Sequence, residues 1–359
     1  MAKILISDPT LRDGNHAVQH RLEPEQIRRY AAAANAARVP VVEVGHGNGL
    51  GASSLQVGES LLSDREMLRI AREQLTDVKL GAFGIPGFAT MLRDLDVAIQ
   101  EGADVFRVGA HCTEADLTER HISYLAELGK EVYGVLMMCH MAPVDRLCEE
   151  ARKMESYGAQ GIVIMDSAGA FLTDGVRERI SALVDSTSVA IGFHGHNNLC
   201  LAVANSVAAV EEGATIIDGT ARGFGAGAGN TELEVLVAVF HELGHETGID
   251  LYKALDAAEL AERDLVQQLP TTDSVTIVSG LAGVFSGYSK PVRRIAAEFE
   301  VDPRDVFFAL GKREVIAGQE DVILEVATAL REAVEVRMEV QVEMGDGTGI
   351  DVQIQGEVA

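Results

Sequence analysis

The chain has 359 residues, of which 47% are hydrophobic, and its formal net charge at pH 7 is −25. This length is sufficient for one α/β barrel with a small appendage. The acidic balance argues against nucleic-acid binding, because phosphates require Lys and Arg partners, and no uncharged apolar run reaches the roughly 18 residues of a transmembrane helix.

The N-terminus and the cysteines indicate a compartment. The N-terminal segment lacks the apolar core of a signal peptide. The four cysteines contain no CxxC pair. We therefore expect a cytoplasmic protein with reduced thiols and no contact with a membrane.

Short apolar runs alternate with amphipathic segments from the N-terminus to about residue 246. The runs are rich in Val and Ile and mostly apolar at every position, as strands buried on both faces must be. The predicted strands are Ile4–Ser7, Val41–Val44, Val78–Phe83, Val105–Val108, Val132–Met138, Gly161–Met165, Val189–Phe193 and Thr215–Ile217. The amphipathic segments between them include Pro24–Ala37, Ser63–Gln74, Thr90–Glu101, Ala142–Tyr157, Thr173–Val184 and Leu199–Glu212.

Eight β units, each followed by an α unit, predict an α/β fold of the (β/α)8 TIM barrel type over residues 1–250. A doubly wound open sheet is the alternative. It would carry Gly-x-Gly-x-x-Gly after the first strand, and Asp8–Asn15 contains no such motif.

The C-terminal part of the chain loses this rhythm. Residues 251–333 contain further helical patterns and predict a smaller helical domain beside the barrel. Within residues 334–359, Val334–Val342 alternates between apolar and polar residues, a glycine-rich turn follows, and Ile350–Ile354 alternates again. This pattern predicts a terminal β-hairpin, and a partly ordered tail is the alternative.

Polar residues gather where the predicted strands end, and in such a barrel the chemistry takes place at the C-terminal ends of the strands. Asp13 follows the first strand, and His194 and His196 follow the seventh. Side chains at i and i+2 of a strand point to the same side, so the two imidazoles form half of a divalent-metal site. Taken alone, the pair is equally compatible with two histidines that only make hydrogen bonds.

These residue types suit one kind of chemistry. Asp13, His194 and His196 supply a three-point set of ligands that leaves positions for water and substrate. Arg12 carries a guanidinium suited to a carboxylate or an enolate oxygen, and a histidine such as His16 suits general acid–base catalysis. Together they predict Lewis-acid chemistry on a 2-oxoacid.

Several motifs resemble a known family. Thr10–Gly14, which reads Thr-Leu-Arg-Asp-Gly, and His194-Gly195-His196 resemble the pyruvate aldolase and acyl-lyase superfamily of metal-dependent TIM barrels. Longer matches narrow the resemblance to the 4-hydroxy-2-oxovalerate aldolases, from residue 3 to about residue 333. They are His111–Asp116, Leu136–Met138 with His140–Pro143, Met154–Ala159, Asp166–Ala170, Leu201–Ser206 and Gly225–Asn230.

The resemblance implies an activity, the reversible retro-aldol cleavage of a 4-hydroxy-2-oxoacid to pyruvate and an aldehyde. By the same resemblance, Asp13, His194 and His196 would hold Mn²⁺, or Mg²⁺ or Co²⁺ in its place. Arg12 would stabilise the pyruvate enolate. His16 would take the proton from the C4 hydroxyl of the substrate.

The resemblance also implies roles for other polar residues, and some of these residues have a second explanation. Ser167 would lie beside the pyruvate carboxylate. Glu43 and Asn230 would support the site from behind, although loop hydrogen bonds explain both residues equally well. For Asp8 the structural explanation is the favoured one, a polar residue where the first strand enters its loop.

The resemblance also implies a partner. Such aldolases pair with an acylating aldehyde dehydrogenase, which receives the aldehyde through an internal channel. The small C-terminal helical domain would be the contact, and Gly318–Asp321 matches a family motif there.

The chain differs from the family pattern near the aldehyde. Phe285 stands in place of a family tyrosine. Tyr288, three residues later, is a candidate replacement, and a surface or packing role is the alternative for it. Phe83 and Ile85 replace family leucines, and Ala317 replaces a glycine. We therefore expect the first four of these side chains to contact the substrate, and we hypothesise an aldehyde that is aromatic or larger than the usual one.

Two alternatives stay open at this point. The first is an acyl-CoA lyase or condensing enzyme of the same superfamily, although the lyase would carry a cysteine within Gly223–Asn230, where there is none. The second is a catalytically silent partner subunit, suggested by Phe285 and Ala317. The intact Arg12 argues against it, because a scaffold has no need for an enolate-stabilising arginine beside a metal.

Overall fold

The computed structural model describes residues 2–345, and over 335–345 it describes the helical backbone alone. Eight parallel strands form a closed barrel in which each strand pairs with the next and β8 pairs with β1. The strands are β1 (Leu5–Leu11), β2 (Val41–Val44), β3 (Lys79–Gly84), β4 (Val105–His111), β5 (Glu131–Met137), β6 (Gly161–Asp166), β7 (Ala190–Gly195) and β8 (Ile216–Asp218). The predicted TIM barrel is therefore confirmed.

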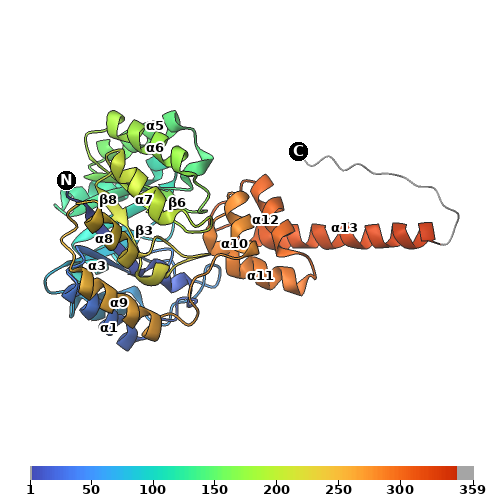
Figure 1. The fold of residues 1–359 in the computed structure, drawn as a ribbon, viewed down its shortest axis with the longest axis horizontal. Helices are drawn as coiled ribbons and strands as arrows, with labels where there is room; N and C mark the ends of the chain where they lie inside the picture. Colours follow the sequence, from blue (N-terminus) through green and yellow to red (C-terminus); the bar gives the residue numbers. More distant parts are fainter. Residues whose placement is uncertain (1, 346–359) are drawn as a thin grey trace.

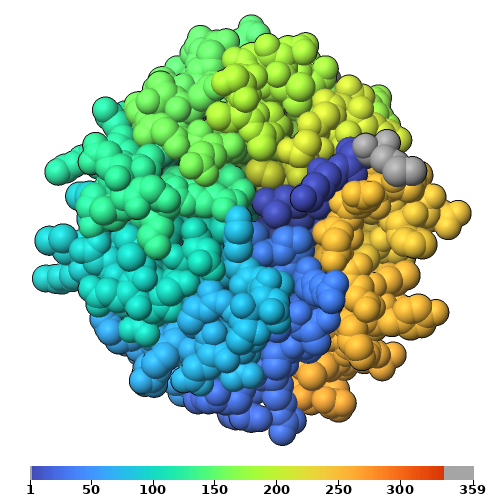
Figure 2. All heavy atoms as spheres, turned by 90° about the vertical axis from the view of Figure 1, so that its left-hand side faces the viewer, coloured from blue at the N-terminus to red at the C-terminus, as the bar shows by residue number. Residues whose placement is uncertain are grey.

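Helices follow the strands in turn along the chain, and the colours in Figure 2 run around the barrel in the same chain order. The helices are α1 (Pro24–Ala36), α2 (Asp64–Arg72), α3 (Asp96–Gln100), α4 (Glu119–Glu127), α5 (Val144–Ser156), α6 (Thr173–Ser186), α7 (Ala202–Glu211) and α8 (Leu233–Glu242). The predicted segments omit α4 and α8. A π-helical turn, Met91–Leu95, precedes the short α3, so the predicted helix Thr90–Glu101 is divided.

Helix α9 (Leu251–Asp264) begins where we expected the barrel to end, yet it packs against α1 and α8. Ala254, Ala261 and Leu265 belong to the same apolar cluster as the barrel residues. A second apolar cluster begins at Val275. We therefore propose that the border between the two domains lies after α9.

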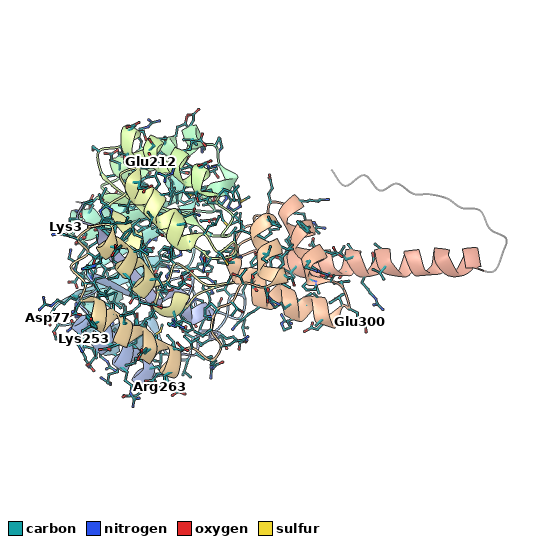
Figure 3. The ribbon with its side chains drawn as sticks, viewed as in Figure 1. Lys3, Asp77, Glu212, Lys253, Arg263 and Glu300 are labelled. Atoms are coloured by element: carbon teal, nitrogen blue, oxygen red, sulfur yellow. The ribbon has the colours of Figure 1, made fainter. Side chains whose placement is uncertain are left out.

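The second cluster is formed by α10 (Ser274–Leu281), α11 (Ser289–Glu298), α12 (Pro303–Lys312) and α13 (Asp321–Gly345). These helices form a smaller body beside the barrel (Figure 1). Charged side chains such as Glu212, Lys253 and Arg263 lie at the outer surface of the barrel, and Glu300 lies on the helical body (Figure 3).

The predicted terminal β-hairpin is wrong for its first strand. Val334–Val342 lies in α13, which continues to Gly345 and extends away from the helical body (Figure 1). This helix starts on the buried side chains of Ile323 and Val326, so the residues after them lengthen an existing helix. Lengthening a helix costs less than starting a two-stranded hairpin that packs on nothing. The expected second strand, Ile350–Ile354, lies outside the described residues.

Two further expectations concern the whole chain. Within residues 2–345, none of the helices is long and apolar enough to cross a membrane. All four cysteines are free, and three of them are buried.

Candidate active site

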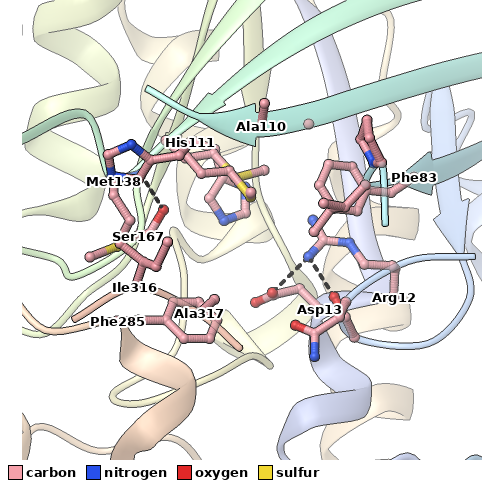
Figure 4. A pocket seen from close by; sticks show the side chains of 18 of the residues that line it. Arg12, Asp13, Phe83, Ala110, His111, Met138, Ser167, Phe285, Ile316 and Ala317 are labelled. Atoms are coloured by element: carbon pink, nitrogen blue, oxygen red, sulfur yellow. Dashed lines mark hydrogen bonds and ion pairs between the residues drawn. The ribbon is translucent and has the colours of Figure 1, made fainter. Parts of the chain in front are cut away.

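One cavity, with a volume of about 170 Å³, opens at the C-terminal ends of the strands. Its wall comes from most of the strand ends and from the helical body, which contributes Phe285, Ile316 and Ala317 (Figure 4). The cavity brings together nearly all of the predicted site residues. These are Arg12, Asp13, His16, Phe83, Ile85, Ser167, His194, His196 and Phe285.

Three of these residues form a cluster that could hold a metal ion. The ligand atoms of Asp13, His194 and His196 all lie within 4.8 Å of one another, and all three residues are buried. His194 lies on β7 and His196 directly follows this strand, as the i and i+2 spacing predicts. Their rings meet edge to face with centroids 5.1 Å apart.

The nitrogen atoms of the two histidines fit a cation. His194 donates from Nδ1 to Oδ2 of Asp218 over 2.8 Å, which leaves its Nε2 as the ligand atom. This Nε2 and the Nδ1 of His196 are buried without a hydrogen-bond partner in the described part of the chain. Buried nitrogens left without partners are costly, and one carboxylate with two imidazoles suits a divalent transition metal. The residues present therefore fit Mn²⁺ or a similar ion.

Asp13 is held in its ionised form. Burial raises the pKa of its carboxyl, but the Arg12 guanidinium and His196 outweigh burial and hold the pKa well below its usual range. Arg12 donates from Nη1 to Oδ1 over 2.8 Å, and Asn230 donates from Nδ2 to Oδ2 over 2.6 Å. A Cβ on Gly225 would lie 2.7 Å from Oδ2, so only glycine allows this loop to approach. Asn230 thus supports the site from behind.

Arg12 is oriented by its neighbours on three sides. Its Nε donates to Oε1 of Glu43 over 2.6 Å, and Nη1 also donates to the carbonyl of Gly47 over 3.2 Å. The ring of Phe83 lies 4.8 Å from Cζ. Its Nη2 is buried and has no partner among the residues described, so it is available to a substrate oxygen. Glu43 therefore holds the Arg12 guanidinium beside the cavity.

His16 ends the 3-10 turn Asp13–His16 and lines the same cavity. Burial lowers the pKa of its imidazole, so the ring is neutral at pH 7 and able to accept a proton. A Cβ on Gly47 would lie 2.5 Å from Nε2, which shows how closely the ring approaches this backbone. The ring of Phe285 meets it edge to face with centroids 6.2 Å apart.

Ser167 lies across the cavity from Arg12 (Figure 4). Its Oγ accepts the backbone N–H of Met138 over 3.0 Å. Because the hydroxyl accepts this bond, its own hydrogen remains free to donate to an anionic group in the cavity.

The expected substrate contact by Tyr288 is wrong. Its side chain does not line the cavity, and only 1% of the residue is exposed. Its hydroxyl donates to the carbonyl of Ile316 over 2.6 Å and accepts the N–H of Gln319 over 3.0 Å. Tyr288 therefore fixes the turn that carries Ile316 and Ala317 into the cavity wall, and it replaces no hydroxyl at the substrate.

Asp8 has the structural role favoured by the sequence. Its carboxylate accepts the backbone N–H of Thr10 over 2.9 Å, the Thr10 hydroxyl, and the Tyr30 hydroxyl over 2.6 Å. These bonds tie β1 to α1 outside the cavity.

Two charged residues behind the site were not predicted. Asp218, at the end of β8, contacts His194, and Arg107, in the middle of β4, contacts Asp218 and Glu43. A signal for Arg107 was present, since it is the only charged residue in the otherwise apolar run Val105–Val108. The identity of its partners follows only from barrel closure.

The barrel and its cluster of Asp13, His194 and His196 define a class of protein, the TIM barrels with a candidate metal site at the C-terminal ends of the strands. Residues 3–261 match the HMGL-like family, and residues 270–332 match the DmpG-like communication domain. Over 91% of its length the chain is 62% identical to the 4-hydroxy-2-oxovalerate aldolase of Pectobacterium atrosepticum and covers 96% of it. It is 59% identical to the protein of the same name from Spirochaeta aurantia, over 91% of this chain and 96% of that one. The chain belongs to the 4-hydroxy-2-oxovalerate aldolase family.

A solved structure shares the fold. The carboxyl transferase domain of Rhizobium etli pyruvate carboxylase, with pyruvate and biocytin, superposes with a TM-score of 0.78 at 18% identity. The match covers 92% of this chain and 61% of that chain. The names of the close sequence relatives favour the aldolase over the acyl-CoA alternative and over a silent subunit.

Proposed function

We propose that this protein catalyses the reversible retro-aldol cleavage of a 4-hydroxy-2-oxoacid to pyruvate and an aldehyde, with Mn²⁺ as its cation. The observation that carries the proposal is that Arg12, Asp13, His16, His194 and His196 line a single cavity. The names of the relatives support the same reaction.

The chain's own residues divide the work. Asp13, His194 and His196 would hold the cation, which would supply Lewis-acid polarisation of the 2-oxoacid. His16 accepts the proton of the C4 hydroxyl, the C3–C4 bond breaks, and its electron pair becomes the C2–C3 double bond of the pyruvate enolate. Arg12 donates from Nη2 to the enolate oxygen, where negative charge develops. C3 then takes up one proton and His16 releases the proton that it accepted, so pyruvate forms and the neutral imidazole is restored.

Ser167 orients the substrate in this scheme. Its hydroxyl hydrogen donates to the carboxylate of the 2-oxoacid, because its oxygen already accepts from Met138. Ser167 and Arg12 lie on opposite sides of the cavity, so they bind the two ends of the pyruvate unit (Figure 4).

Pyruvate release from metal-stripped protein tests this function. With 4-hydroxy-2-oxovalerate as substrate, we expect pyruvate release to require added Mn²⁺. The rate of release should rise in proportion to the amount of Mn²⁺ bound. Longer and aromatic analogues of the substrate are assayed beside it. Protein that binds Mn²⁺ but releases no pyruvate from any analogue would contradict the aldolase and favour an acyl-CoA reaction or a silent subunit.

The apolar side of the cavity is proposed to take the aldehyde. Phe83, near the end of β3, and Ile85, directly after this strand, lie in the wall, and Phe285 reaches it from the helical body. A Cβ on Gly109 would lie 2.7 Å from the ring of Phe83, so this glycine makes room for the ring. Aromatic and aliphatic side chains in the wall favour an aromatic or larger aldehyde over acetaldehyde.

In the same assay, Phe83→Leu should reduce the preference for aromatic over methyl-bearing substrates. Loss of one aromatic contact corresponds to a change of about fivefold to tenfold in the ratio of the two kcat/KM values. Equal turnover of both substrate types by the wild type and by Phe83→Leu would contradict the proposed aldehyde.

The match to a communication domain indicates interaction with a partner dehydrogenase. We propose that this partner is an acylating aldehyde dehydrogenase that binds the helical body. Leu281, Phe308 and Leu324 are exposed there, and such apolar side chains suit a protein interface. The two proteins, mixed, should elute as one complex in size-exclusion chromatography, and separate elution would contradict the proposal.

A further inference from the structure

Five side chains form a continuous chain of contacts through the barrel. Arg12 donates to Glu43 over 2.6 Å, and Oε2 of Glu43 lies 3.4 Å from Nη1 of Arg107. The same Nη1 lies 2.7 Å from Oδ2 of Asp218, which accepts from His194 over 2.8 Å. The chain of contacts therefore runs from the proposed enolate-binding guanidinium to a proposed metal ligand.

Arg107 lies at the centre of this chain and below the cavity. It shares the inward face of β4 with Gly109 and His111, which line the cavity, because alternate residues of a strand point to the same side. Its side chain is 1% exposed. The interior layers of such barrels are usually filled by Val, Ile and Leu, so a charge at this position is unexpected for packing alone.

The two carboxylates explain why a cation is needed there. Glu43 and Asp218 are both buried, and without Arg107 two like charges would remain in the barrel interior. Each carboxylate also holds one group of the site. Glu43 sets the direction of Arg12, and Asp218 fixes the proton of His194 on Nδ1 and so turns Nε2 towards the cluster.

The formal charges of the site agree with the proposed substrate class. Arg12 and Arg107 oppose Asp13, Glu43 and Asp218, which leaves one negative charge. A divalent cation changes this to one positive charge, the complement of a monocarboxylate. Loss of Arg107 would remove this net positive charge and would also remove the contact that joins Glu43 to Asp218.

We propose that Arg107 is a positioning residue that couples the orientation of Arg12 to that of His194 through Glu43 and Asp218. The inference deepens the proposed function, since it rests on the roles assigned there to Arg12 and His194. Arg107 touches neither substrate nor cation. It acts by holding the side chains of Arg12 and His194 in fixed orientations relative to each other.

The first measurement is Mn²⁺ binding without substrate, followed by the EPR signal of the free ion. Arg107→Met should raise the dissociation constant of Mn²⁺ about 10-fold to 100-fold, the usual effect of losing an outer partner of a metal ligand. Arg107→Lys restores the positive charge and should return the constant to within about threefold of wild type. Wild-type affinity in a folded Arg107→Met protein would overturn the proposal.

A matched control comes from Arg179, a partly buried arginine outside the chain of contacts. It donates to the carbonyls of Cys139 and Ala142 and stacks on Phe171. Arg179→Met should lower the melting temperature and leave Mn²⁺ affinity unchanged. An equal loss of affinity in this variant would show that Arg107→Met acts through general destabilisation and would overturn the proposal.

The second measurement tests the coupling itself. Glu43→Gln should weaken Mn²⁺ binding at least about threefold in the wild-type background and should have no further effect in Arg107→Met. An equal effect of Glu43→Gln in both backgrounds would place the coupling in the contact between Arg12 and Asp13 and overturn the role of Arg107. If Arg107→Met does not fold, Arg107→Gln replaces it in both measurements.

A failure of the proposed role of Arg107 can be distinguished from a failure of the proposed aldolase function. Mn²⁺ binding is measured without any 2-oxoacid, so it reports on the chain of contacts even if the wild type releases no pyruvate. If pyruvate is released, kcat of Arg107→Lys should recover together with its Mn²⁺ affinity. Recovery of the affinity without recovery of kcat would overturn the coupling to Arg12.

Discussion

Arg12→Ala should lower kcat for pyruvate release by about 10²-fold to 10³-fold, the usual cost of removing one preorganised donor to a developing oxyanion. The free Nη2 of Arg12 is the donor that would meet the enolate oxygen, and the other guanidinium contacts hold it in place. Because the negative charge is largest in the enolate, the loss should fall mainly on kcat and less on KM.

Two controls separate this effect from loss of metal. Mn²⁺ should still bind to Arg12→Ala, because Asp13 keeps its contact with Asn230 and loses only a competing cation. Arg12→Lys keeps the charge but not the planar fork that contacts Glu43, Asp13 and Gly47, so most of the activity should remain lost. A kcat of Arg12→Ala within tenfold of wild type would contradict the assigned role.

The barrel was predictable because its strands are buried on both faces, and this burial leaves a direct trace in the sequence. Val41–Val44 is the clearest case, where the predicted and observed bounds agree. The prediction of a β-hairpin in the C-terminal tail was wrong for a related reason. Alternation in Val334–Val342 predicts a strand, but the sequence alone does not show that α13 already exists before it and extends through it.

The residues at the centre of the site were predictable because they stand in short local motifs. Arg12, Asp13 and His16 are neighbours in sequence, and His194 and His196 share one strand end. The chain of contacts behind these residues was not predictable from the sequence. Arg107 and Asp218 meet only because β4 and β8 face each other across a closed barrel. The prediction that Tyr288 contacts the substrate was wrong because the spacing between Phe285 and Tyr288 does not give the direction of the tyrosine ring. The hydroxyl of Tyr288 points to Ile316.

Asp13→Asn should weaken Mn²⁺ binding about 100-fold or more and lower kcat/KM about 10³-fold at limiting metal, because the cluster loses its anionic ligand. The substitution is also unfavourable locally. Oδ1 accepts from Arg12 and Oδ2 accepts from Asn230, so the new amide must direct its NH₂ group at one of these two donors.

The matched control for Asp13→Asn is Asp8→Asn, which alters a second buried carboxylate that lies outside the cavity. Asp8 accepts from Thr10 and Tyr30, so this variant should lose stability in a thermal melt and keep wild-type Mn²⁺ affinity. Saturating Mn²⁺ should restore part of the activity of Asp13→Asn but none of that of Arg12→Ala, because only the first variant is limited by occupancy of the site. Wild-type Mn²⁺ affinity in Asp13→Asn would show that the cluster of Asp13, His194 and His196 does not bind the cation, and the Lewis-acid part of the mechanism would then fail.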